Sequence, residues 1–179
     1  MHQRGLSLVE LLVVLVTITV LMKFAGPSLS DLIASQRHQT SAEQLAKGLQ
    51  TARTEAILRS QNVIIHAIND DWSQGWRIIL DLSGQGPEDL NNPTLIERQD
   101  SSHGPIVGNQ HVKRFVRFSS IGVPTNEGVA GGTLHICARQ HPISHHRVVL
   151  ARTGRIRLEA GDKQEALCGA PGSEQRANA

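Results

Sequence analysis

The sequence predicts an α+β fold in which one long N-terminal α-helix packs on antiparallel β-sheets. Two observations support it: apolar residues recur every three to four positions up to about Ser60, and beyond Ser60 the apolar period changes to two. A helix followed by a run of strands, without alternation between the two, is typical of α+β domains. A length of 179 residues suits one such domain with an appended segment.

The first predicted element is an apolar run from Leu6 to Met22 that contains one acid, Glu10. Its length is at the low end for a bilayer span, and no small-residue cleavage site of a secretory signal peptide follows it. A carboxylate inside an apolar helix needs a partner. We therefore expect residues 6–27 to form a transmembrane helix in which Glu10 has a specific contact.

The second element is an amphipathic helix over residues 28–60. Its apolar side chains recur at helical spacing, and charged residues occupy the opposite face. The pair Gly26-Pro27 is expected to kink the helix between the two halves, because proline removes a backbone donor and clashes with the preceding turn. The first half therefore needs lipid or other subunits, whereas the second half packs on a sheet.

The period-two region, residues 62–169, contains seven predicted strands separated by Gly, Pro, Asn and Ser clusters. Segments 82–93 and 141–146 are expected to be loops, and residues 170–179 a flexible tail. The predicted strands are Val63–Ile68, Gly75–Leu82, Thr94–Arg98, Val112–Phe118, Thr133–Ala138, Arg147–Ala151 and Arg155–Glu159.

The N-terminal segment RGLSLVELLVVLVTITVL resembles that of type IV pilins and pseudopilins, the class III signal family. The resemblance implies that a prepilin peptidase removes a leader of residues 1–5 by cutting after Gly5, and that Leu6 becomes the methylated N-terminus. Glu10 would pair with the terminal amine of a neighbouring subunit. Leu6 departs from the phenylalanine usual in the family. An ordinary signal-anchor helix is the alternative.

The resemblance extends over nearly the whole chain, to the GspH/FimT group of minor pilins. It rests on the helical stretch ending in ARTEAILR and on RFSSIGVPT, GTLHICA and RVVLARTGRIRL. It implies a type IV pilin fold with a globular domain over residues 28–169. It also implies an inner-membrane protein with a periplasmic domain, which joins other pilin subunits in a surface fibre after assembly.

The two cysteines, Cys137 and Cys168, are expected to pair if the chain is exported as the resemblance implies. The bridge would hold the tail beside the last predicted hairpin. A metal site formed by Cys137, His141, His145 and His146 is the rival reading, although zinc sites of this kind usually contain paired cysteines at short spacing. No cofactor is expected.

Charge is unevenly distributed along the chain. Seven acids and two arginines lie between His66 and Val112, whereas the segment from Lys113 to Arg157 has one acid, Glu127. Segregation of this kind favours a polyanionic partner, and a solvated strand face is the alternative. The basic residues of the second segment are Lys113, Arg114, Arg117, Arg139, Arg147, Arg152, Arg155 and Arg157.

The strongest candidate site is a hairpin formed by RVVLA and RIRLE around Thr153-Gly154. Strand alternation places Arg155 and Arg157 on one face, about 7 Å apart, which is close to the spacing of successive phosphates of a DNA strand. Ile156 and Leu158 then face the core. Arginine suits phosphate because its planar fork donates two hydrogen bonds.

The residues Gly154-Arg155-Ile156-Arg157 resemble the GRxR motif of FimT-type minor pilins that bind DNA during natural transformation. The resemblance implies that Arg155 and Arg157 are the central contacts in sequence-independent binding to the DNA backbone. Charge and proximity add Arg152, Arg147, Arg139 and the His141–His146 loop as supporting candidates.

Two other functions share this anchor and fold. In the first, the chain is a structural minor pilin that primes pilus assembly for motility or adhesion. In the second, it is the H-type pseudopilin of a type II secretion system. An enzyme is not expected, because the sequence contains no Ser/His/Asp or paired-carboxylate constellation. Aromatic residues make up only 3% of the chain, which makes a base-stacking platform hard to build.

Overall fold

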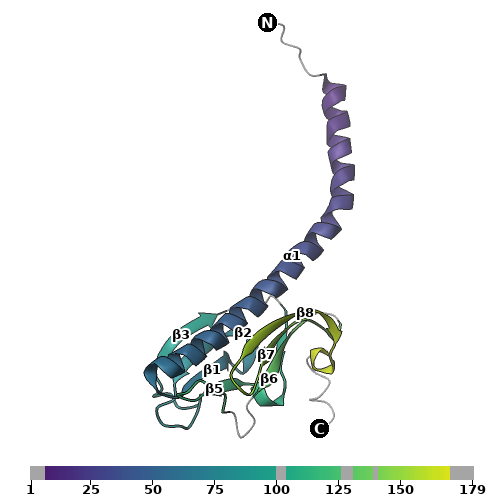
Figure 1. Ribbon diagram of the computed structural model, residues 1–179. Coiled ribbons are helices and arrows are strands. Elements are labelled where there is room, and N and C mark those ends of the chain that lie inside the picture. The colour runs from purple at the N-terminus through teal and green to yellow at the C-terminus, as the bar shows by residue number, and fades with distance from the viewer. Residues whose placement is uncertain (1–6, 100–103, 126–130, 139–140, 170–179) are drawn as a thin grey trace, which may run out of the picture. The chain divides into compact units, whose positions relative to one another are not determined.

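A computed structural model describes residues 7–99, 104–125, 131–138 and 141–169, and for residues 21–31 it describes the backbone alone. The chain divides into two compact units, Met1–Arg37 and His38–Ala179. The long helix α1 (Leu8–Arg59) continues from the first unit into the second (Figure 1). The tail predicted for residues 170–179 lies outside the described residues.

The first unit contains the N-terminal part of α1, where large apolar side chains are exposed from Leu8 to Val20. The hydroxyls of Thr17 and Thr19 donate to backbone carbonyls four residues earlier, so they are satisfied inside the helix. Among the described residues, no helix has the length and apolarity that a membrane span requires. The anchor predicted for residues 6–27 stays a prediction.

In the second unit, the C-terminal part of α1 buries one face, as its amphipathic pattern predicts. Gly48 shows how closely this helix approaches a sheet. A Cβ atom on Gly48 would lie 2.8 Å from the indole ring of Trp76, so only glycine fits without a shift. The buried helix residues are Ala42, Leu45, Ala46, Leu49, Ala52 and Ala56.

The first sheet has four antiparallel strands in the order β3-β2-β1-β5. They are β1 (Val63–Ile68), β2 (Asp71–Leu80), β3 (Thr94–Gln99) and β5 (Phe115–Phe118). Asn69 and Asp70, with φ of 50° and 62°, form the turn between β1 and β2. Positive φ at both positions is typical of a tight two-residue hairpin.

The second sheet is also antiparallel, with the order β4-β6-β7-β8. Its strands are β4 (Ile106–Gly108), β6 (Gly132–Cys137), β7 (Ile143–Leu150) and β8 (Ile156–Gln164), and two short 3-10 helices lie at Gln110–Val112 (η1) and Ala166–Cys168 (η2). Among the described strands β8 lies at the edge of this sheet, and none of them pairs with its outer backbone edge.

One hydrophobic core joins α1 and both sheets. Ile65 and Val116 of the first sheet, and Leu134 and Val148 of the second, belong to the same buried cluster as the helix residues. The indole N–H of Trp72 donates to the carbonyls of residues 112 and 113, 3.1 and 3.0 Å away. The shared buried cluster holds the two sheets in one α+β fold, as the sequence predicts, and the Trp72 hydrogen bonds hold β2 to the end of η1.

The structure corrects several element boundaries. The predicted loop at 141–146 is largely strand, because β7 begins at Ile143. The sequence pattern missed the first half of β7 because a bulge between Ser144 and His146 shifts the side-chain alternation. The predicted strand from Val112 begins only at Phe115, after η1. The short strand β4 was not predicted.

Candidate nucleic-acid interface

The predicted basic hairpin is present as strands β7 and β8. Leu150 pairs with Ile156, and Val149 with Arg157. The amide of Gly154 donates to the carbonyl of Ala151 at 2.9 Å, which closes the turn. Gly154 has φ of 80°, a conformation that disfavours other residues.

The glycine is needed for space as well as for conformation. A Cβ atom on Gly154 would lie 2.3 Å from the carbonyl oxygen of Gly122. The hairpin turn is therefore packed directly on the loop of residues 119–123. Backbone atoms cannot move aside as a flexible side chain can, so this contact fixes where the basic turn sits.

Side-chain alternation on β8 agrees with the prediction near the turn and less well further along. Arg155 and Arg157 are exposed, whereas Ile156 is partly buried and packs against the core. Leu158, predicted to face the core, leaves 39% of its surface exposed. Leu158 lies on the edge strand β8, and the core covers the start of β8, at Ile156, more fully than its middle.

Three of the basic residues between Lys113 and Arg157 are paired with acids. Arg114 contacts Asp70, and Arg147 contacts Glu159. Arg117 Nε lies 2.9 Å from Asp81 Oδ2. Two of these acids, Asp70 and Asp81, come from the acidic middle of the chain, so the charge segregation seen along the sequence is partly cancelled in space.

Besides the exposed Lys113, the remaining described basic residues of this segment are Arg152, Arg155 and Arg157, all exposed. Within the described ranges, no ion pair or hydrogen bond engages their guanidinium groups. Together they place three positive charges within six residues around one turn. Arg139 lies outside the described residues, so its contribution stays a prediction.

The two cysteines form a disulfide bond, as predicted. Cys137 in β6 is bonded to Cys168 in η2, with a Cα–Cα distance of 5.4 Å. Cys137 is therefore not available as a thiolate ligand, which argues against the alternative metal site. No group of three or more potential metal ligands occurs among the residues that the structure describes.

The histidines near this bridge take part in structural contacts instead. His145 Nδ1 lies 2.7 Å from Asp162 Oδ1 on β8, and its ring lies 4.9 Å from that of His38 on α1. Burial lowers the pKa of His135 and of His146 below the usual histidine value. Both are thus held toward the neutral form, and they add little positive charge near neutral pH.

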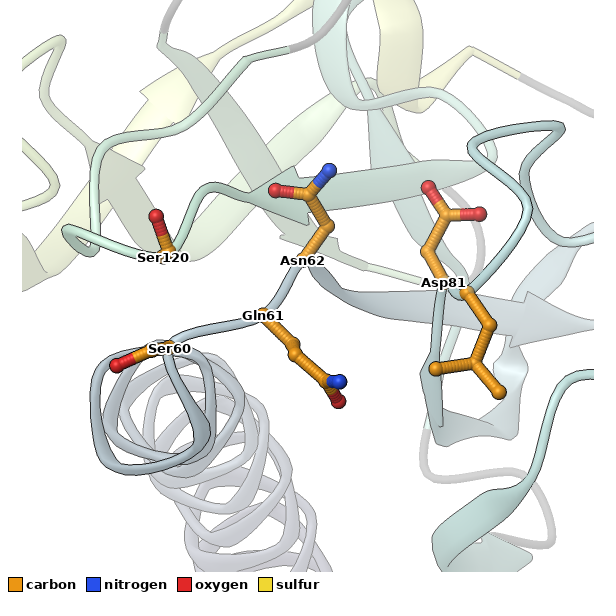
Figure 2. A pocket seen from close by; sticks show the side chains of 6 residues that line it. Ser60, Gln61, Asn62, Asp81 and Ser120 are labelled. Atoms are coloured by element: carbon orange, nitrogen blue, oxygen red, sulfur yellow. The ribbon is translucent and has the colours of Figure 1, made fainter.

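A shallow pocket of about 240 Å³ lies elsewhere, at the C-terminal end of α1. Figure 2 shows that the polar groups of Ser60 and Gln61 point in different directions. Asp81 also lines it, but its carboxylate contacts Arg117 and accepts from the amide of Gly86 at 3.2 Å. The lining therefore offers no pair of groups arranged for catalysis.

The predicted processing and assembly residues lie at the other end of the chain. Gly5 and Leu6 are outside the described residues. Glu10 lies in the first turn of α1 and is exposed. An exposed acid on an otherwise apolar helix surface is open to a partner in another subunit.

Comparison with known proteins agrees with this fold. A family model described as "Type II transport protein GspH" matches residues 41–154, more than half of the chain. A search of curated proteins finds no match.

Two crystal structures of the type IV minor pilin FimU from Pseudomonas aeruginosa PAO1 are similar to this chain. One is 23% identical and covers 73% of this chain and 93% of that chain, with a TM-score of 0.56. The other crystal form is 24% identical and covers 73% of this chain and 98% of that chain, with a TM-score of 0.55. The likeness shows an α+β pilin fold, a long N-terminal helix packed on antiparallel sheets.

Proposed function

Because this chain belongs to the GspH family of pilins and pseudopilins, we propose that it is a minor type IV pilin that binds DNA through its basic β7–β8 hairpin. The family is structural and non-enzymatic, so its members act through what they bind. The observation that carries the proposal is the exposed cluster of Arg152, Arg155 and Arg157, which has no acidic partner among the described residues.

The proposed ligand is the phosphate backbone, without sequence preference. Arg155 and Arg157 are two residues apart along an extended segment, hence about 7 Å, a spacing that lets each guanidinium contact a different phosphate of one DNA strand. Trp72, Trp76 and Phe118 are buried, so they are not available to stack on bases. Both features favour phosphate contacts over base contacts.

The proposed setting is the uptake of DNA in natural transformation. One subunit with a few phosphate contacts should bind weakly, with a dissociation constant of about 10⁻⁴ to 10⁻⁶ M. Several subunits in one fibre would raise the apparent affinity through avidity. Other pilin subunits are therefore partners in the proposed function as well as in assembly.

Processing and location follow from the same proposal. Prepilin peptidase cuts after Gly5, Leu6 is methylated, and Glu10 pairs with the terminal amine of a neighbouring subunit. Before assembly the chain spans the inner membrane once and its domain faces the periplasm. After assembly the domain lies on the cell-surface pilus. A mass spectrum of the membrane-extracted protein with an intact Met1 would contradict this processing.

A second candidate is the H-type pseudopilin of a type II secretion system, which the description of the matching family favours. A structural minor pilin that primes pilus assembly is related to it. Neither role requires the exposed arginine cluster. DNA binding therefore separates the first proposal from the other two.

The test is a gel shift with the full-length chain in nonionic detergent, with duplex and single-stranded DNA at two salt concentrations. We expect a shift that Arg155→Ala with Arg157→Ala abolishes. The charge-matched control is Arg77→Ala with Arg98→Ala on the first sheet, which should bind as wild type. Normal binding by the hairpin variant would show that the hairpin is not the site.

A further inference from the structure

Three segments meet beneath the hairpin turn, and one of them brings a further arginine. Arg53, in the last third of α1, donates from Nε to the carbonyl of Gly122 at 2.9 Å. A Cβ atom on Gly154 would lie 2.9 Å from that same Nε and 3.5 Å from Cδ of Arg53. The guanidinium of Arg53 is therefore in contact with the residue that precedes Arg155.

The contact orients the Arg53 side chain. A guanidinium has five N–H donors in a rigid plane, and the Nε donor is used by Gly122. Among the described residues, no further hydrogen bond or ion pair engages this guanidinium. The two terminal nitrogens are left for a ligand, and together they form a fork that matches two phosphate oxygens.

Among the described side chains of α1, no nearby acid cancels this charge. Glu55, two residues further along the helix, forms an ion pair with Arg59 at 2.7 Å. Residues two apart on a helix do not face each other. Arg53 thus carries an uncompensated positive charge among the described residues, next to the turn that holds Arg152 and Arg155.

We propose that Arg53 is a further DNA-binding residue, which places a phosphate of the bound strand beside the hairpin turn. The inference rests on the proposed function and extends its site from one hairpin to three elements, namely α1, the 119–123 loop and the β7–β8 turn. Because Arg53 is half-buried and held at Nε, little side-chain freedom is lost when it binds.

A residue that only holds the turn in place would also be needed for a stable fold. The salt dependence of DNA binding distinguishes this structural role of Arg53 from a direct contact with phosphate. A lost phosphate contact lowers the slope of log affinity against log salt by about 0.9. Loss of a hydrogen bond that only holds the turn lowers stability and leaves the number of phosphates contacted unchanged.

The experiment measures anisotropy of a short fluorescein-labelled duplex with the full-length chain in nonionic detergent, over a series of NaCl concentrations. We expect Arg53→Met to weaken binding several-fold and to reduce the slope by about 0.9. Arg53→Lys keeps the charge and should keep the slope, with weaker binding because the fork is lost. Arg59→Met, on the same helix, is the control and should match wild type.

The outcomes separate the two proposals. If Arg53→Met keeps the wild-type slope while Arg155→Ala with Arg157→Ala loses binding, the hairpin stands and the role of Arg53 is overturned. If wild type binds but the hairpin variant binds equally well, the hairpin site is wrong, and so is Arg53 as its extension. If wild type shows no salt-dependent binding, both proposals fail.

Discussion

Arg117 Nε lies 2.9 Å from Oδ2 of Asp81, whose side chain is fully buried. Arg117 comes from the basic part of the chain and Asp81 from the acidic middle. Their pairing explains why the count of basic residues along the sequence overstates the positive surface. It also makes Arg117 a residue of the fold instead of a DNA contact.

The first prediction follows from that burial. Arg117→Met should lower the free energy of unfolding by about 3 kcal/mol, because it leaves the carboxylate of Asp81 buried without its counter-charge. Urea unfolding followed by circular dichroism measures the change. Arg114→Met is the control and should have a small effect, since its partners Asp70 and Glu88 are solvent-exposed. Equal effects of the two substitutions would contradict the assignment.

The second prediction concerns the hairpin turn. Gly154→Ala should lower the free energy of unfolding by about 3 kcal/mol, through positive-φ strain and the clash with the Gly122 carbonyl. Gly84→Ala is the matched control, because Gly84 has a similar φ of 75° and nothing within 4 Å of its Cβ position. Gly84→Ala should lower the free energy of unfolding by about 1 kcal/mol, from the positive-φ strain alone. Thermal unfolding compares the two, and a loss no larger at Gly154 would rule out the close contact.

The elements that the sequence predicted well are those with an uninterrupted pattern. The helix was expected to end near Ser60 and ends at Arg59, and β1 has the predicted limits. The elements it missed lack such a pattern. Strand β4 has only three residues, and the polar second half of β8, up to Gln164, carries no apolar alternation because it lies at a sheet edge.

The candidate site shows the same division. Local sequence was enough to predict the turn at Gly154 and the exposure of Arg155 and Arg157. It could not tell which arginines are neutralised, because Asp81 and Arg117 are joined only by the sheet. Nor could it bring Arg53 to Gly154, since 101 positions separate them in the chain and only packing on the 119–123 loop makes them neighbours.

The third prediction is a loss of stability in mild acid. Burial is the main cause that lowers the pKa of His66, His135 and His146 below 6.5. The unfolded chain therefore binds more protons than the folded chain between the lowered values and 6.5. The contribution of these three histidines to the free energy of unfolding is fully present above about pH 6.5, and it is lost as the pH falls through their folded-state pKa values.

The measurement for this prediction is urea unfolding at about pH 7.5, 6.5 and 5.5. His135→Gln should make the free energy of unfolding depend less on pH, because glutamine retains polar groups but does not titrate. His66→Gln and His146→Gln should reduce the pH dependence in the same direction, since burial also lowers the pKa of these two histidines. Stability that stays level or rises as the pH falls to 5.5 would show that the buried histidines do not govern it.

The fourth prediction concerns the bridge between Cys137 and Cys168, whose sequence separation is 31. Replacing both by serine should lower the free energy of unfolding by about 3–4 kcal/mol, because the unfolded chain gains freedom. DNA affinity without denaturant should stay the same, since the bridge lies beyond the end of β8 and the basic turn precedes its start. Urea unfolding with and without reductant measures the first effect, and anisotropy the second. Two reactive thiols in the folded, unreduced chain would show that the bridge does not form.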